Sequence, residues 1–193
     1  MRQVAAFDFD GTLTTRDTFA PYLRLVAGIP AFAVAVAATA PLLVAAAVFD
    51  GRRDPAKAAF LRRILAGREE AALRDLGARY ADSVVADHLR VDMRARLESH
   101  RRDGHELVIV SASPTLYLDA VGERLGVDTV LATELEVAAD GRLTGEIAGA
   151  NVRRAEKVRR LDAWLDGPAE IWAYGDSTGD RELLARADHS MKV

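Results

Sequence analysis

The stretch that decides the fold occupies residues 4–13 and reads VAAFDFDGTL. Its first four residues are apolar, as in a buried strand, and two carboxylates, Asp8 and Asp10, follow before Gly11. Aspartate is depleted in strands, and side chains two positions apart point the same way. Their like charges oppose each other's ionisation unless a cation or a shared proton compensates. A divalent cation such as Mg²⁺, which prefers oxygen ligands, would compensate them.

Two interpretations of this stretch are open from the residues alone. In the first, Asp8 attacks phosphorus as a nucleophile and Asp10 acts as acid and base, which is a form of covalent catalysis. In the second, Asp10 and Thr12 cap a turn or a helix N-terminus and have no chemical role. The choice between them depends on what other chemistry the chain brings to the same place.

Composition narrows the class of protein. The chain has 193 residues, of which 50% are hydrophobic and 28% charged, so it is long enough for one core with a smaller insert. The formal net charge of -3 argues against nucleic acid as the main partner. There is no cysteine, which excludes disulfides, thiolate catalysis and zinc sites with cysteine ligands.

A long uncharged run extends from Leu25 to Phe49. Its length reaches the range of a membrane-spanning helix, but Pro30 and Pro41 argue against a straight span. We therefore expect two short apolar helices, over Pro30–Thr39 and Pro41–Phe49, each with proline in its first turn. The preferred interpretation is a buried helical hairpin inside an inserted domain. The alternative is a surface that dips into a bilayer or receives a lipid tail.

The rest of the chain alternates between two patterns. Apolar β-rich runs predict strands over residues 3–8, 105–111, 128–133, 169–175 and 189–193. Helical periodicity predicts helices over residues 14–26, 56–65, 69–89, 90–103, 116–125, 154–165 and 180–187. Segments 134–137 and 142–147 flank an Asp-Gly turn and predict a hairpin. This order predicts an α/β fold with a doubly wound parallel sheet, formed by residues 1–14 and 91–193 and interrupted by an all-helical insert over residues 15–90.

Polar side chains follow three of the predicted strands. In an open α/β sheet, ligands bind beyond the carboxyl ends of the strands, so these side chains should meet. Besides Asp8 and Asp10, the second strand ends at Ser111 and a later one at Asp176, with Asp180 close behind. Asp176 would be a third carboxylate for the cation, and Ser111 offers a hydroxyl to a phosphate oxygen. The alternative roles are ordinary turn and helix-cap positions.

A lysine in the helix before the last of these strands completes the set. Lys157 would neutralise a phosphate oxygen or the nucleophile. The alternative is a solvated surface position, because Lys157 lies in an arginine-rich run.

Together, the DFDGT of residues 8–12, Ser111, Lys157 and the GDSxxD of residues 175–180 resemble the four motifs of the haloacid dehalogenase (HAD) superfamily of phosphatases. The motifs occur in the family's order and cover the whole predicted sheet domain. The helical insert after the first motif resembles the type I cap of subfamily IB, the phosphoserine phosphatase-like branch.

The resemblance implies a role for each motif. Asp8 would be the nucleophile and Asp10 the general acid and base. Asp8, the backbone carbonyl of Asp10, and Asp176 would hold Mg²⁺, with Asp180 supporting the metal site. Implied contacts with the phosphoryl group come from five residues: Gly11, Thr12, Ser111, Ala112 and Lys157. The family typically hydrolyses phosphomonoesters, so a small phosphorylated metabolite such as phosphoserine is the expected substrate.

We expect the helical insert to determine substrate specificity. Phosphoserine phosphatases carry a glutamate after the first motif that meets the substrate amine, and this chain has Asp17 at about that place. They use a cap arginine for the substrate carboxylate, and Arg62 or Arg63 would serve here. The chain departs from them at Gly179, where they usually have asparagine, and it lacks their glycines after the second motif.

A second resemblance favours a lipid substrate. Residues 17–24, the apolar run after them and the Gly51-Arg52 pair are similar to the bacterial phosphatidylglycerophosphate phosphatase of the same superfamily. There the apolar stretch is membrane-associated. This resemblance implies a lipid-phosphate phosphatase at the membrane surface, with contact through residues 25–49. The expected location is the cytoplasm, or the inner face of the membrane as a peripheral protein.

Other classes of function are weaker. A catalytically idle HAD-like binding module should have lost at least one of its key residues, and Asp8, Asp10, Lys157 and Asp176 are all present. A receiver-type signalling domain would lack the helical insert and the second aspartate of the first motif. A phosphotransferase that passes the phosphoryl group from Asp8 to another alcohol shares the same intermediate, so it stays open.

Overall fold

The computed structural model describes residues 1–193, apart from the side chain of Asp50. The central sheet has five strands: β1 (Arg2–Phe7), β2 (Glu106–Pro114), β3 (Thr129–Thr133), β6 (Ala169–Gly175) and β7 (His189–Lys192). Their order across the sheet is β3-β2-β1-β6-β7, and every neighbouring pair is parallel. This arrangement confirms the predicted α/β fold class.

Both faces of the sheet are buried by helices. These helices are α5 (Val91–Arg102), α6 (Thr115–Leu125), α7 (Ala155–Leu165) and α8 (Arg181–Arg186). Val4 and Ala6 of β1 belong to one apolar cluster, with residues of α7 and α8. Ala5 and Phe7 belong to the other, with residues of α5 and α6. Alternate residues of the central strand thus face opposite layers, as expected when a parallel sheet is covered on both sides.

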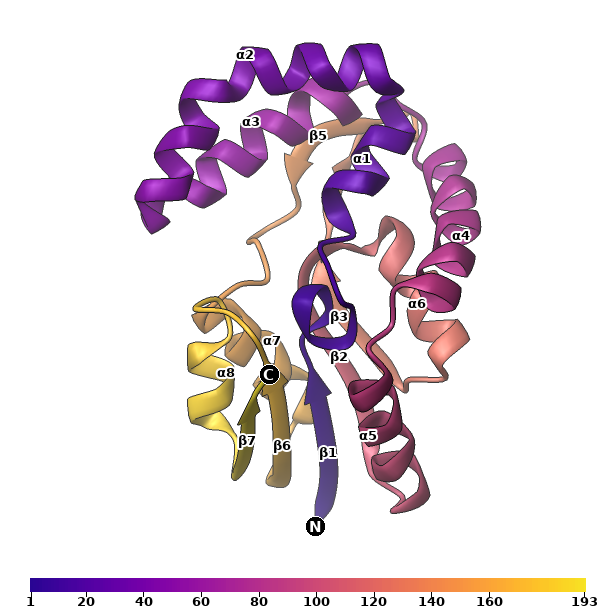
Figure 1. Ribbon diagram of the computed structural model, residues 1–193, viewed down its shortest axis with the longest axis vertical. Coiled ribbons are helices and arrows are strands. Elements are labelled where there is room, and N and C mark those ends of the chain that lie inside the picture. Colours follow the sequence, from indigo (N-terminus) through magenta and orange to yellow (C-terminus); the bar gives the residue numbers. More distant parts are fainter.

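Four further helices lie between β1 and α5 in the chain: α1 (Phe19–Ala27), α2 (Ile29–Val48), α3 (Arg53–Leu65) and α4 (Glu70–Asp87). A short helical turn over Asp50–Arg52 joins α2 to α3. In Figure 1, α1, α2 and α3 lie above the carboxyl ends of the strands, and α4 runs down one side next to α6. We call the segment with these four helices the cap.

A two-stranded antiparallel hairpin lies with the cap. It consists of β4 (Leu135–Val137) and β5 (Leu143–Ile147). The N–H of Gly67 donates to the carbonyl of Leu143, and the N–H of Leu143 donates to the carbonyl of Arg68, both at 2.8 Å. The hairpin is the one predicted from the Asp-Gly turn. The predicted division placed it in the sheet domain, whereas its contacts run to the end of α3.

Most of the uncharged run forms one helix, α2, so the prediction of two short helices is wrong. Helix α2 continues through Pro41. Proline removes the hydrogen bond to the carbonyl four residues earlier, which here belongs to Ala37. Ala37 lies on the exposed side of the helix, where its carbonyl is open to water and the helix need not end.

The expected burial of this run is also wrong. Only 17% of the most apolar window of α2 is buried, and its mean hydropathy is 2.3. By length and composition alone, α2 is the one helix in the described part of the chain that is suited to crossing a membrane. The described residues include ten large apolar side chains that are exposed, and seven of them belong to this run: Leu25, Ile29, Val34, Leu42, Val44, Val48 and Phe49. The cap therefore presents an apolar outer surface.

A buried histidine connects α5 to the sheet. The Nε2 atom of His100 lies 2.7 Å from the hydroxyl of Tyr174, and its Nδ1 atom lies 2.8 Å from Nδ1 of His105. Burial lowers the pKa of His100 to about 4, and the nearby His105 and Arg96 act in the same direction. The folded protein therefore holds His100 neutral.

We expect His100→Gln to weaken the acid sensitivity of folding. The pKa of His100 is about 4 in the folded protein and 6.5 as the ordinary value, so its contribution to stability is complete above pH 6.5 and is lost as the pH falls toward 4. Urea unfolding at neutral pH and at about pH 5 measures the loss, which should be smaller in the variant. His88→Gln, whose ring contacts Arg16 near the surface, is the control and should keep the parent's acid sensitivity. An equal loss in the parent and in the His100 variant would contradict the assignment.

Candidate active site

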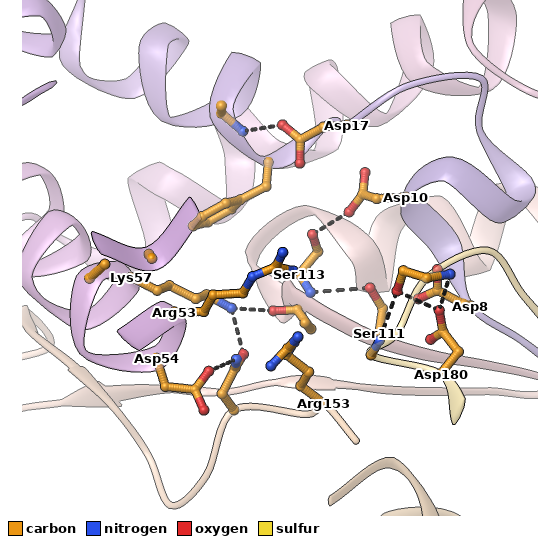
Figure 2. Close-up of a pocket in the computed structure, with 18 of the residues that line it drawn as sticks. Asp8, Asp10, Asp17, Arg53, Asp54, Lys57, Ser111, Ser113, Arg153 and Asp180 are labelled. Atoms are coloured by element: carbon orange, nitrogen blue, oxygen red, sulfur yellow. Dashed lines mark hydrogen bonds between the residues drawn. The ribbon is translucent and has the colours of Figure 1, made fainter. Parts of the chain in front are cut away.

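The carboxyl ends of β1, β2 and β6 meet beneath the cap at a cavity of about 500 Å³. Figure 2 shows most of its lining residues. They come from the ends of the strands on one side and from the cap, with α1, α2 and α3, on the other. The core contributes Asp8, Asp10, Ser111, Ala112, Ser113, Asn151, Arg153, Lys157, Ser177, Gly179 and Asp180. Asp8, Asp10, Ser111 and Asp180 are thus brought to one place, and Asp176 lies close to Asp8 and Asp180 without lining the cavity.

Lys157 reaches the floor of this cavity from α7. Its Nζ atom donates to Oδ1 of Asp8 at 2.5 Å, to Oδ1 of Asp180 at 2.6 Å and to the carbonyl of Val110 at 2.6 Å. These three acceptors use all three N–H groups of the ammonium. The Lys157 side chain is only 2% exposed, so it does not occupy the solvated position considered as its alternative.

Burial and the ion pairs set the charge of this group. Burial raises the pKa of Asp8 to about 7, although the charge of Lys157 opposes the change. Burial alone would lower the pKa of Lys157, but Asp8 and Asp180 raise it above its ordinary value. Lys157 is therefore a permanent cation, and a second cation near Asp8 would favour its ionised form further.

A cluster of three carboxylates could hold a cation. Asp8, Asp176 and Asp180 each offer an oxygen, and these atoms lie within 4.8 Å of one another. The hydroxyl of Thr12 contacts Oδ2 of Asp8 at 3.1 Å and Oδ1 of Asp176 at 3.4 Å. A Cβ atom on Gly11 would lie 2.6 Å from Oδ2 of Asp176, so glycine is needed for this close approach. An all-oxygen donor set of this kind fits Mg²⁺.

The second aspartate of the first motif points elsewhere. Oδ1 of Asp10 accepts hydrogen bonds from the backbone N–H and the hydroxyl of Thr18, both at 2.6 Å. Its Oδ2 accepts the hydroxyl of Ser113 at 2.5 Å. Burial raises the pKa of Asp10, while these donors oppose the shift. The Asp10 carboxylate is therefore outside the three-carboxylate cluster, and its expected contribution to a metal through the backbone carbonyl stays a prediction.

The carboxyl end of β2 has the expected place, although the strand continues past Ser111 to Pro114. Ser111 is buried, and its hydroxyl accepts the N–H of Ser113 at 3.1 Å. The carbonyl of Ala112 accepts a hydrogen bond from Lys57 of α3. Gly11 and Thr12, which the resemblance assigns to phosphate, do not line the cavity, because the Thr12 hydroxyl is directed at carboxylates.

The cap residues chosen from the sequence fall into two groups. Asp17 lines the cavity, and its Oδ2 accepts the N–H of Ala20 at 3.0 Å, at the start of α1. Arg62 instead pairs with Glu146 of β5 on the outside, with 2.5 Å between Nε and Oε1. Arg63 is exposed on α3 and does not line the cavity. The expected carboxylate-binding role of Arg62 or Arg63 therefore has no support in their positions.

Other cations face the cavity in their place. Arg53 and Lys57 belong to α3, and Arg153 belongs to the segment before α7. Burial lowers the pKa of Lys57 to about 8, against the charges of nearby carboxylates. The sequence contains one signal for these residues. Arg53, Lys57 and Phe60 are three or four positions apart, so they share one face of a helix. Packing decides which face of the helix meets the cavity, so the spacing alone does not identify these residues as part of the site.

The upper wall of the cavity is apolar. It includes Phe19 and Ala20 from α1, Leu43 and Ala46 from α2, and Ala56 and Phe60 from α3. Charged groups gather at the floor and along one side, and hydrocarbon covers the roof. The cavity thus suits a ligand with an anionic end and a less polar remainder.

Known proteins resemble this chain over most of its length. The family model described as haloacid dehalogenase-like hydrolase matches residues 5–185. The chain is 39% identical over 186 residues to "Protein CicA" of Caulobacter vibrioides, an alignment that covers 96% of this chain and 83% of that protein. It is 36% identical over 116 residues to a phosphoserine phosphatase of Streptomyces coelicolor, covering 55% of this chain and 28% of that protein. A solved structure of a Bordetella pertussis Tohama I protein of unknown function matches with a TM-score of 0.86 and 26% identity, over 100% of this chain and 90% of that one.

Proposed function

The chain belongs to the haloacid dehalogenase-like hydrolase family and is a phosphatase, and on this basis we propose that it is a Mg²⁺-dependent phosphomonoesterase that works through a phosphoryl group on Asp8. One observation carries the proposal. Asp8 lies at the floor of the cavity, held by Lys157 and next to Asp176 and Asp180. This arrangement combines a nucleophile, a buried cation and a set of oxygen ligands for a metal.

The proposed reaction has two steps. In the first, an oxygen of Asp8 forms a bond to phosphorus while the bond to the leaving oxygen breaks, and Asp10 donates its proton to the departing alcohol. In the second, Asp10 takes a proton from water, the water oxygen attacks phosphorus, and the bond to Asp8 breaks to release phosphate. Burial raises the pKa of Asp10, which favours the protonated form that the first step needs.

Charge neutralisation supports both steps. Lys157 would place its positive charge beside the phosphoryl group, and the hydroxyl of Ser111 would donate to a phosphoryl oxygen, because both residues line the cavity with Asp8. Mg²⁺, held by Asp8, Asp176 and the backbone carbonyl of Asp10, would supply the positive charge that lets a carboxylate approach a phosphate dianion. Phosphoryl transfer depends mainly on such positioning and electrostatics.

A small phosphorylated metabolite such as phosphoserine is the proposed substrate. The cavity of about 500 Å³ is of the size that holds small ligands. Arg53 lies on its α3 side, where it would meet an acidic group of the substrate, and Asp17 would meet an amine. The similarity to a phosphoserine phosphatase over 116 residues supports this class of substrate.

Phosphate release with and without Mg²⁺ tests the proposal. The substrate set should include phosphoserine, sugar phosphates, nucleotides, and phosphatidylglycerophosphate in detergent. We expect Mg²⁺-dependent release from at least one small phosphomonoester. Turnover that is unchanged by chelation of the metal, or no turnover of any member of the set, would contradict the proposed function.

A lipid phosphate at a membrane surface is the second candidate. Its support is that α2 contributes to two surfaces at once. Leu43 and Ala46 line the cavity, while Val44 and Val48 on the same helix are 65% and 70% exposed. A lipid tail entering the cavity would thus continue along the apolar outside of α2. Arg24 and Arg52 are exposed near the two ends of the helix and would face anionic headgroups. If the substrate is a lipid phosphate, the proposed location is the inner membrane surface. If it is a small metabolite, the proposed location is the cytoplasm.

We expect the double variant Val34→Glu and Val44→Glu to lose membrane binding while it keeps turnover of a soluble phosphomonoester. Two carboxylates on the exposed face of α2 would have to enter the apolar layer, which is costly. Flotation with vesicles of phosphatidylglycerol and phosphatidylcholine measures the binding. Val91→Glu, at an 86% exposed valine outside the cap, is the matched control and should float like the parent. If the parent does not float, this candidate fails, and the small-metabolite proposal is unaffected.

A further inference from the structure

Two residues of α3 connect the cap directly to the sheet domain. Lys57 donates from Nζ to the carbonyl of Ala112 and to Oδ1 of Asn151, the latter at 2.6 Å. Asp54, one helical turn earlier, accepts the Nδ2 of Asn151 at 2.6 Å. The hydroxyl of Thr133 donates to the same Oδ1 at 3.1 Å, which fixes the asparagine from the core side. Figure 2 shows Asp54 and Lys57 on the cap side of the cavity, with dashed lines joining both to core residues.

The target of Lys57 is a single peptide unit, the one that joins Ala112 to Ser113. Lys57 holds its carbonyl oxygen, and the hydroxyl of Ser111 accepts its N–H at 3.1 Å. The side chain that follows this peptide is that of Ser113, whose hydroxyl donates to Oδ2 of Asp10 at 2.5 Å. A rotation of this peptide would therefore move both a phosphate-binding hydroxyl and the contact to Asp10.

The burial of Lys57 costs free energy that a merely structural position would not require. It is enclosed by the cavity wall, with the ring of Phe19 5.1 Å from its nitrogen. In the part of the chain that the structure describes, no carboxylate lies within 4.0 Å of this nitrogen, although Asp54, Asp10 and Asp17 act on it from further away. A buried cation without a close ion pair costs free energy that an apolar side chain would not. Lys57 donates hydrogen bonds to the Ala112 carbonyl and to Asn151.

We infer that Lys57 is a positioning residue, which fixes the Ala112–Ser113 peptide from the cap and thereby holds Asp10, through Ser113, in place to protonate the leaving alcohol. The inference rests on the proposed function, in which Asp10 is the general acid. Because Lys57 belongs to the cap and Ser113 to the core, the acid is in position only while α3 lies over the carboxyl end of β2.

The leaving group distinguishes this role from a structural one. p-Nitrophenol is acidic and departs without a proton, whereas an alkyl alcohol needs one from Asp10. We expect Lys57→Met to lower kcat for an alkyl phosphomonoester by about tenfold or more, and kcat for p-nitrophenyl phosphate by less than about threefold. Ser113→Ala should show the same difference between the two substrates. The combined variant should be no slower than the slower single one, because both act through one peptide.

Controls separate the possible failures. Lys192→Met, at an exposed lysine of β7, should change neither rate. Thermal unfolding checks that Lys57→Met is folded, and Lys57→Gln replaces it if it is not. Equal losses on both substrates, or effects of Lys57→Met and Ser113→Ala that multiply in the combined variant, would overturn the inference while leaving the proposed function intact. Absence of metal-dependent turnover in the parent would overturn the proposed function and this inference with it.

Discussion

Asp8→Asn should abolish turnover and leave the fold intact. An amide oxygen has no negative charge with which to attack phosphorus, so the proposed intermediate cannot form. We expect kcat to fall by at least about 10⁴-fold, which is the scale of losses when a nucleophile is removed. Asparagine has nearly the same shape as aspartate, and Lys157 keeps its bonds to Asp180 and to the carbonyl of Val110. Phosphate release with Mg²⁺ and a thermal unfolding curve measure the two expectations.

The control for charge is Asp75→Asn, which makes the same change at an exposed residue of α4 and should keep full activity. A direct sign of the intermediate would come from Asp10→Asn acting on p-nitrophenyl phosphate, because p-nitrophenol departs without a proton and only the second step then needs Asp10 as general base. Mass spectrometry of that variant, quenched during turnover, should show one added phosphoryl group, located at Asp8. Substantial metal-dependent activity in Asp8→Asn would contradict a mechanism with a phosphoryl group on Asp8.

The floor of the site could be predicted from the sequence because topology places it. Asp8, Ser111 and Asp176 lie at the carboxyl ends of strands that are parallel neighbours, and parallel strands bring these ends to one edge of the sheet. No knowledge of packing is needed for this step. Lys157 was the harder case, since its arginine-rich neighbours suggest a surface. The resemblance to the HAD motifs, and not the local pattern, was what identified it.

The cavity-facing side of the cap could not be predicted in the same way. Arg62 and Lys57 are both basic residues of one amphipathic helix, and they differ only in which side of α3 they occupy. That side is chosen by the burial of Phe60, Leu61 and Ile64 against the rest of the cap. A sequence periodicity describes the apolar stripe but does not say which of its two polar borders meets the active site.

Helix α2 escaped prediction for a different reason. Sequence analysis assumes that apolar residues are buried, and α2 is apolar and yet largely exposed. Pro41 predicts a helix start, because a proline within a helix leaves one carbonyl without a donor. An exposed helix tolerates that defect. Both errors thus have one cause, which is that the run lies on the outside of the protein.

Lys157→Met should destabilise the protein and make its stability depend on divalent cation. The substitution keeps the length of the side chain but leaves Asp8 and Asp180 buried without the ammonium that both contact. Removing one partner of a buried ion pair typically costs about 3–5 kcal/mol, so we expect a loss of that order in the free energy of unfolding without Mg²⁺. Urea unfolding in a chelating buffer measures it, and Lys192→Met is the matched control.

Added Mg²⁺ should then restore part of the stability of Lys157→Met, and more than it adds to the parent. A cation on the carboxylate cluster would compensate charges that the parent already balances with Lys157, and a ligand that binds only the folded state stabilises it by mass action. Turnover should remain lost, because Mg²⁺ on the cluster does not replace the ammonium beside Asp8. A variant whose stability is the same with and without Mg²⁺ would contradict a metal site at Asp8, Asp176 and Asp180, and it would do so without relying on any measurement of activity.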